Sequence, residues 1–323
     1  MQDLNIFYSR LAMVGLIMAL GVFLGKIKWI SDGTNKQLIN ILLLVAMPAA
    51  LFGAFPREFD QGAMMVFLTG LGAGALVLLT MMIVAKLLFN KVTMKKATRY
   101  AMCESQFALI FNNAAFLGLP LVLAIYGQEA MMPYCGFIIP FNLALFGYGV
   151  YLMKGKFDAK LFWSTLLNPN IIAVVLGAIL FLTSTSVVVA ETFCAGGAMV
   201  DRVIRETIAM VAQMMTPLSL VCIGYMLSRA NVRVLLKKKR LFITAAVQLT
   251  LGPVMTWGIL YLLGVPVEVR NILVLIQALP TATSLGLFAE KYDGDPISAS
   301  ELVVISTLMS IVTLPIMLGL LMN

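Results

Sequence analysis

The chain has 323 residues, of which 61% are apolar and only 12% are charged, with a formal net charge of +8. Soluble domains carry about 25% charged residues, so this composition excludes a soluble globular protein and predicts an all-α polytopic membrane protein. The sequence has no histidine and no phosphate-binding loop ending in Gly-Lys-Ser/Thr. We therefore expect no enzyme activity, no metal site and no cofactor.

Ten apolar stretches follow one another along the chain, each close to the roughly 20 residues that a bilayer crossing needs. Bounded by charges and turn residues, they lie near 5–25, 36–55, 62–89, 97–126, 130–153, 167–184, 207–228, 241–263, 270–290 and 297–321. We refer to them as predicted helices 1 to 10.

The basic residues predict the orientation of these helices. Of the 23 lysines and arginines, 18 fall in the connections that follow odd-numbered helices. Because basic residues stay on the cytoplasmic side, both termini are predicted to lie outside. We interpret the basic run Lys237–Arg240 as part of this orientation signal and not as a nucleic-acid site.

Two pairs of similar features recur at nearly the same spacing, which indicates an internal duplication. Pro48 and Pro217 are 169 positions apart, and the turn at 126–129 matches the turn at 292–295 at an offset of 166. We predict a first repeat over 1–153, a connection over 154–166 and a second repeat over 167–323. Since each repeat holds five crossings, the second copy must be inverted, which is an architecture of secondary transporters.

Predicted helices 4 and 9 carry features that interrupt a helix. Gly118 and Pro120 lie in the first, and Pro280 lies in the second. We expect helix 4 to break at Gly118–Pro120 and helix 9 to break at Pro280, with the two breaks crossing. Half-helices that begin there would point the positive ends of their dipoles at the crossing, which favours an anion such as a carboxylate.

Neither broken helix has a lysine or arginine in its middle. An anion held there would depend on dipoles, amides and hydroxyls. The alternative is that these polar groups only repair the broken helices or bridge neighbouring ones. The candidate substrate-binding residues are Asn112, Asn113, Pro120, Gln277, Pro280, Thr281, Thr283 and Ser284.

Five short motifs together resemble those of the auxin efflux carrier family, which includes the plant PIN carriers and their bacterial relatives. They occur in the family's order along essentially the whole chain, at 113–127, 168–170, 216–220, 277–280 and 313–316. The resemblance implies a homodimeric carrier in the cell membrane that transports a small organic carboxylate by an elevator-like motion. It assigns the scaffold to helices 1, 2, 6 and 7, the transport domain to helices 3–5 and 8–10, and the crossover to Asn113, Pro120 and Pro280.

The sequence leaves several candidates for the ion that drives transport. Glu104 and Glu301 are candidates for proton coupling, because acids within membrane helices are rare and usually functional. Alternatively, Glu104 is an interfacial carboxylate near Lys96 and Arg99, and Glu301 only complements a helix dipole. Sodium symport, as in bile-acid-type carriers of similar architecture, is a rival; the absence of an acid next to either break argues against it. An anion channel is a further alternative.

Small residues are expected to have packing roles. Glycines at 21 and 25 in helix 1, and at 70, 72 and 74 in helix 3, should permit close backbone approach within one subunit. The four cysteines, Cys103, Cys135, Cys194 and Cys222, are widely spaced in the sequence. We therefore expect small apolar side chains and neither a disulfide framework nor a metal site.

Overall fold

The computed structural model describes residues 2–55, 59–95, 97–183, 197–229, 238–292 and 294–321. Within these ranges the chain is helical and contains no strand, apart from one isolated bridge discussed below. Expectations for Lys96, Cys194, Lys237 and Asp293 fall outside the described residues.

Helices occur in each of the first five predicted stretches. They are α1 (Gln2–Lys26); the continuous run of α2 (Asp32–Ile41), η1 (Leu42–Ala46) and α3 (Met47–Phe52); α4 (Gln61–Leu88); α5 (Arg99–Ile110), η2 (Ala114–Gly118) and α6 (Leu119–Tyr126); and η3 (Gln128–Ala130), α7 (Met131–Ala144), η4 (Leu145–Gly149) and α8 (Val150–Lys154). Several begin at side-chain caps: the Asp60 carboxylate accepts from the first turn of α4, and the Thr98 hydroxyl from that of α5.

The other five stretches are helical as well. They contain α9 (Ala159–Ser164), η5 (Thr165–Leu167) and α10 (Pro169–Thr183); α12 (Gly197–Gln213) and α13 (Met215–Ser228); α15 (Lys239–Leu262); α16 (Val267–Gln277) and α17 (Ser284–Lys291); and α18 (Pro296–Leu321). Asn168 separates η5 from α10, and the two segments on either side are bent by 49°.

Six helices of the described chain are long and apolar enough to cross a membrane, and a seventh is added if the bent pair is one span. The predicted helices that fall short are the first, whose described apolar part is Ala12–Lys26, and the fourth and ninth, which are broken into short pieces. The structure therefore supports a multi-pass membrane protein, while ten crossings and an inverted repeat stay predictions.

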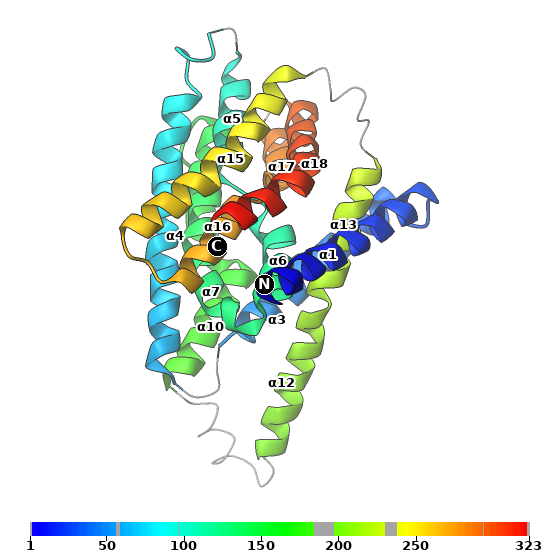
Figure 1. The fold of residues 1–323 in the computed structure, drawn as a ribbon, viewed down its shortest axis with the longest axis vertical. Helices are drawn as coiled ribbons and strands as arrows, with labels where there is room; N and C mark the ends of the chain where they lie inside the picture. Colours follow the sequence, from blue (N-terminus) through cyan, green and yellow to red (C-terminus); the bar gives the residue numbers. More distant parts are fainter. Residues whose placement is uncertain are drawn as a thin grey trace.

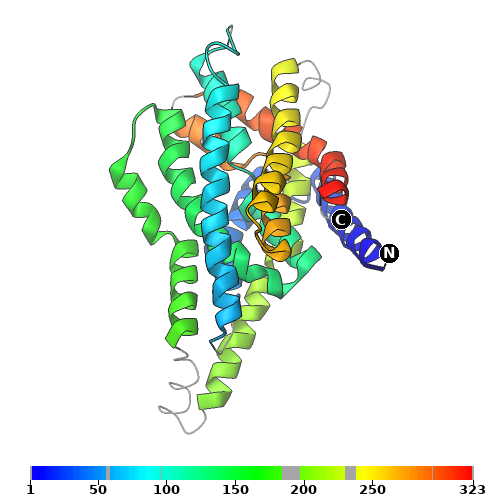
Figure 2. The ribbon, with the colours of Figure 1, turned by 60° about the vertical axis from the view of Figure 1, so that its left-hand side comes forward.

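The helices pack in two groups. In one, α4 packs against α7, and α15 packs against α16 and α18; in the other, α1 packs against α13, and α3 packs against α10 and α12. Figure 1 shows α4 and α15 on the left and α1, α12 and α13 on the right. Figure 2 shows α4 running along the length of the molecule.

Glycines bring helix backbones into direct contact at two places. A Cβ on Gly21 would lie 2.3 Å from the Val221 carbonyl oxygen, where α1 meets α13, and a Cβ on Gly70 would lie 2.3 Å from the Pro133 carbonyl oxygen, where α4 meets α7. Gly25 and Gly74 also lie in close contacts, as expected. The expectation for Gly72 is wrong, because it faces open space on the outer side of α4.

Candidate functional site at the crossing of two broken helices

The first break lies between α5 and η2, at Phe111–Asn113. The Asn113 side chain accepts a hydrogen bond from the Phe116 N–H at 3.2 Å and so caps the helix that follows. The predicted break at Gly118–Pro120 is wrong. Pro120 sits in the first turn of α6 and the preceding turn is π-helical, with the Leu119 N–H bonded to the Ala114 oxygen, so the helix continues through the proline.

The second break is where the sequence predicts it. Helix α16 ends at Gln277, α17 begins at Ser284, and Pro280 lies in the non-helical segment between them. The second half-helix therefore starts four residues after the proline.

The two breaks cross and pair with each other. Asn112 and Thr281 form an isolated antiparallel bridge. The Asn113 N–H donates to the Pro280 oxygen at 2.7 Å, and the Ala282 N–H donates to the Phe111 oxygen at 2.9 Å. Because each break uses the other's backbone as its hydrogen-bond partner, both are tolerated in an apolar interior. The predicted crossing is confirmed.

Two buried amides complete the pairing. Asn112 Nδ2 donates to the Ile276 oxygen and to Gln277 Oε1, both at 2.9 Å. Gln277 Nε2 donates in return to the Leu109 oxygen at 3.2 Å. Each amide thus donates to a carbonyl in the last turn of the opposite half-helix, where the regular helical donors run out. The Ile276 oxygen also accepts from the Leu279 N–H at 3.2 Å. This is the repair role that the sequence analysis left open for such residues.

Thr281 faces the helices behind the crossing. Its hydroxyl donates to Gln248 Oε1 at 2.7 Å, and its N–H donates to the Ser306 hydroxyl at 3.1 Å. Gln248 Nε2 in turn donates to the Leu279 oxygen at 3.1 Å. The second break is therefore fixed to α15 and α18 by buried side chains that the sequence analysis did not single out.

A cavity of about 270 Å³ lies beside the crossing. Four predicted site residues line it: Asn112, Asn113, Thr283 and Ser284. Pro120, Gln277, Pro280 and Thr281 are not part of its lining. The first turns of η2 and α17 both reach it, through Ala114–Phe116 and Thr283–Ser284. The Ser284 hydroxyl is buried and has no hydrogen-bond partner in the described structure.

Three asparagines that the sequence analysis did not assign to the site also line this cavity: Asn142, Asn168 and Asn170. Asn142 comes from the last turn of α7, where it is buried and donates to the Ile138 oxygen at 2.8 Å. In the sequence, Asn142 is recognisable only as a single amide within an apolar stretch. The other two stand at the bend before α10, in a motif that was noted only for its resemblance to a family.

Glu104 lies on α5, well away from the crossing, and is only 2% exposed. Its Oε2 accepts from the Arg240 guanidinium at 3.0 Å and from the Ser298 hydroxyl at 2.9 Å, while Oε1 is buried without a partner. The expected neighbour Arg99 instead donates to the Leu152 oxygen at 3.4 Å. Tertiary packing thus buries Glu104 against α15 and α18, and its cationic partner is Arg240.

Glu301 is in a more open environment. It forms an ion pair with Lys238, and 16% of its side chain is exposed. The pair joins the start of α15 to the first turns of α18. Glu301 is therefore stabilised by Lys238 as well as by the helix dipole, and only the dipole was considered in the sequence analysis.

Thr283 borders a second cavity of about 230 Å³, which also includes Asp32. The absence of an acid next to the breaks was inferred from sequence neighbours alone, and the fold brings Asp32 in from α2. Its carboxylate accepts from the Tyr225 hydroxyl at 2.6 Å and pairs with Arg229 at 3.3 Å.

The part of the chain that the structure describes holds no group of three acidic, cysteine or histidine side chains placed to bind a metal. Cys103, Cys135 and Cys222 are buried free thiols. This agrees with the expectation of small apolar side chains.

Comparison with known proteins places this geometry in a family. No curated protein is significantly similar to the chain. The family model described as membrane transport protein, which is the auxin efflux carrier family domain, matches twice, over residues 6–155 and 153–318. These matches cover nearly the whole chain, which therefore belongs to the auxin efflux carrier family of membrane transport proteins.

Proposed function

We propose that this membrane transporter is a secondary carrier for a small organic carboxylate, which binds in the cavity beside the crossing. The observation that carries the proposal is the composition of that cavity. Two half-helices begin there, five asparagines, a threonine and a serine stand among mostly apolar lining residues, and none of the described lining residues is acidic. Such a site offers an anion hydrogen-bond donors and positive dipole ends without a repelling charge.

Asn113 supplies the most direct contact in this proposal. Its Oδ1 is engaged by the Phe116 N–H, which leaves its Nδ2 group as a donor. Ser284 adds a buried hydroxyl without a partner, and an unsatisfied buried polar group is costly unless a ligand or water completes it. The cavity volume of about 270 Å³ suits a small acid better than a drug-sized ligand.

The packing of the helices supports an elevator-type motion. The scaffold of this proposal consists of α1, α2, α3, α10, α12 and α13, and the transport domain contains both broken helices together with α4, α7, α15 and α18. Strong contacts occur within each group, such as α1 with α13 and α4 with α7, and the two groups meet where α6 of the transport domain packs against α1 and α13 of the scaffold. We place both termini outside the cell membrane, as the basic connections predict, and propose a homodimer as the assembly.

Glu104 is the residue we propose for proton coupling. It is buried, and one of its two carboxylate oxygens has no partner. A proton on Oε1 would remove the charge that Arg240 now compensates. Glu301 has a compensating lysine and greater exposure, so we assign it the lesser role.

Thermal stabilisation of the detergent-purified protein tests the substrate class. The panel contains malonate, malate, acetate and indole-3-acetate, each with a neutral amide analogue, with and without sodium and at two pH values. A ligand that prefers the folded state raises the melting temperature by mass action. We expect a rise with carboxylates only. A rise with the neutral amides alone would contradict the anion site.

A second measurement separates a carrier from a channel. Proteoliposomes are preloaded with the carboxylate that stabilises the protein, and uptake of the labelled compound is followed. A carrier accelerates exchange because the loaded site returns faster than the empty one, whereas a channel shows no such acceleration. We expect acceleration by internal substrate.

A further inference from the structure

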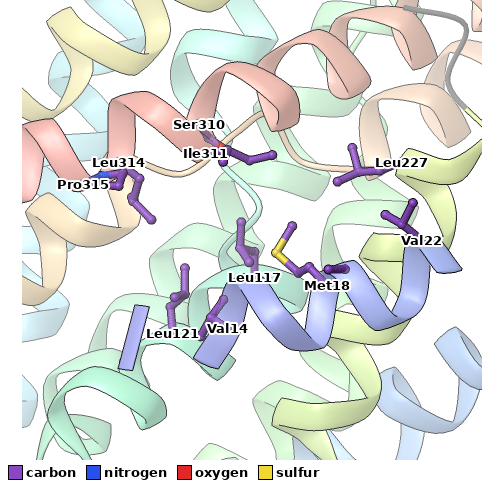
Figure 3. Close-up of a pocket in the computed structure, with 12 residues that line it drawn as sticks. Val14, Met18, Val22, Leu117, Leu121, Leu227, Ser310, Ile311, Leu314 and Pro315 are labelled. Atoms are coloured by element: carbon purple, nitrogen blue, oxygen red, sulfur yellow. The ribbon is translucent and has the colours of Figure 1, made fainter. Parts of the chain in front are cut away.

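A second large cavity lies away from the crossing, as a groove between α1 and α18. Its volume is about 280 Å³. Figure 3 shows Val14, Met18 and Val22 of α1 facing Leu117 and Leu121 below α18, with Ser310, Ile311, Leu314 and Pro315 above. Apart from Ser310, its lining residues are apolar or glycine: Val14, Gly15, Met18, Ala19, Val22, Leu117, Leu121, Leu227, Ile311, Leu314 and Pro315.

The groove opens on a surface of exposed apolar side chains. Ile311 on its wall is 54% exposed, and Leu16 and Leu20 on the neighbouring face of α1 are 71% and 49% exposed. In a membrane transport protein, large apolar side chains with such exposure contact lipid. The groove is therefore continuous with the lipid phase, and water is a poor occupant of an apolar space of this size.

A basic side chain marks one end of the groove. Arg10 precedes Val14 by one helical turn on α1, and its guanidinium donates to the Ile125 oxygen, one turn after Leu121 on α6. Arg10 thus bridges the two helices that form the lower wall. A guanidinium has five N–H donors, so it can bind a phosphate in addition to this carbonyl.

The dimensions fit a single hydrocarbon chain. From Val14 to Val22, α1 rises about 12 Å, which is the length of roughly ten methylene groups. We propose that the groove binds one acyl chain of a bilayer phospholipid, with the lipid phosphate on Arg10. The bound lipid is the occupant of both the apolar groove and its basic end.

This site has a mechanical consequence, which rests on the proposed function. The lipid acyl chain inserts between α1, which we assign to the scaffold, and the helices α6 and α18, which we assign to the transport domain. Movement of one group past the other must change the groove, so the lipid stabilises the arrangement seen here.

Glycine positions offer a matched pair of variants to test the site. A Cβ on Gly15, which lines the groove, meets no atom within 4 Å, and the same holds for Gly72 on the outer side of α4. Gly15→Trp therefore places a large side chain in the groove from a Cβ that meets no neighbouring atom, and Gly72→Trp places the same side chain on the exposed side of another helix. Folding of both is checked by their melting temperatures.

The probe is a phosphatidylglycerol with a diazirine along one acyl chain, present at low fraction in phosphatidylcholine vesicles that hold the full-length protein. After illumination, labelled peptides are mapped by mass spectrometry. We expect preferred labelling of the 14–22 and 310–315 segments, a loss of about tenfold in Gly15→Trp and no change in Gly72→Trp.

Arg10→Gln tests the headgroup contact, and we expect it to reduce this labelling about fivefold, as the loss of one basic residue at an anionic lipid predicts. Uniform labelling of all lipid-facing helices would overturn the proposal. So would displacement of the probe by indole-3-acetate, because the groove would then be part of a solute pathway. Labelling does not require transport, so these outcomes are separate from failure of the proposed carrier function.

Discussion

Asn112 and Gln277 hold the two broken helices together by reciprocal capping. Asn112 Nδ2 donates to Gln277 Oε1 at 2.9 Å, and each amide also donates to a carbonyl at the C-terminal end of the opposite half-helix. Both side chains are buried, at 1% and 2% exposed. The pair therefore supplies donors to the two C-terminal helix ends that meet in this apolar interior, those of α5 and α16.

Replacing either amide with leucine is expected to destabilise the protein. Asn112→Leu leaves the Ile276 oxygen without its side-chain donor, and Gln277→Leu does the same for the Leu109 oxygen. The Ile276 oxygen keeps a bond from the Leu279 N–H at 3.2 Å, so loss of its side-chain donor costs about 0.5–1.5 kcal/mol, whereas an orphaned Leu109 oxygen costs about 1–3 kcal/mol. Both losses lower the apparent melting temperature. Thermal denaturation of the single variants and the double variant measures the coupling. An interaction energy near zero would contradict reciprocal capping, because directly bonded residues couple by about 0.5–3 kcal/mol.

Asn113 is expected to affect binding more than stability. In Asn113→Asp, a carboxylate oxygen can still accept from the Phe116 N–H, so the cap is kept, while a negative charge enters the cavity. We expect loss of carboxylate-induced thermal stabilisation with little change in the melting temperature of the free protein.

Asn113→Ser is the control for this variant, since serine caps a helix without adding charge. It should weaken binding less than Asn113→Asp does. Equal carboxylate affinity in Asn113→Asp and the parent protein would place the anion elsewhere.

Glu104→Gln is expected to uncouple transport from the pH gradient. Glutamine retains an oxygen that can accept from Arg240 and Ser298, but it cannot release a proton. Proteoliposomes should therefore keep substrate exchange and lose uptake driven by an imposed pH difference. Glu301→Gln is the matched control and should keep both, since Lys238 pairs with that acid near the helix end. If Glu104→Gln still showed uptake driven by the pH gradient, Glu104 would not be the residue that couples transport to protons.

The features that the sequence predicted well depend on local composition. Apolar length indicated the helices, and Pro280 marked the second break correctly because a proline there cannot extend α16. The same argument failed at Pro120. A proline in the first turn of a helix loses no bond, so its presence does not say whether a break lies before it or at it.

The features that it missed depend on contacts between distant segments. Gln248 binds Thr281 from 33 positions away, and Arg240 reaches Glu104 across 136 positions. Neither partner is signalled by spacing along one helix. Asn142 could have been noticed as a polar residue in an apolar stretch, but its position in the cavity follows only from how α7 packs.

Gly224 offers a test of the close contact between α1 and α13. A Cβ at this position would lie 2.0 Å from the Met18 carbonyl oxygen and 2.9 Å from Cα of Gly21, so the two backbones must separate to admit it. Gly224→Ala is expected to cost about 1–3 kcal/mol as an overpacked contact and to lower the melting temperature. Gly258→Ala is the control, because a Cβ there meets no atom within 4 Å and alanine raises helix propensity by at most about 1 kcal/mol. If Gly224→Ala and Gly258→Ala had the same melting temperature, α1 and α13 would not be in backbone contact.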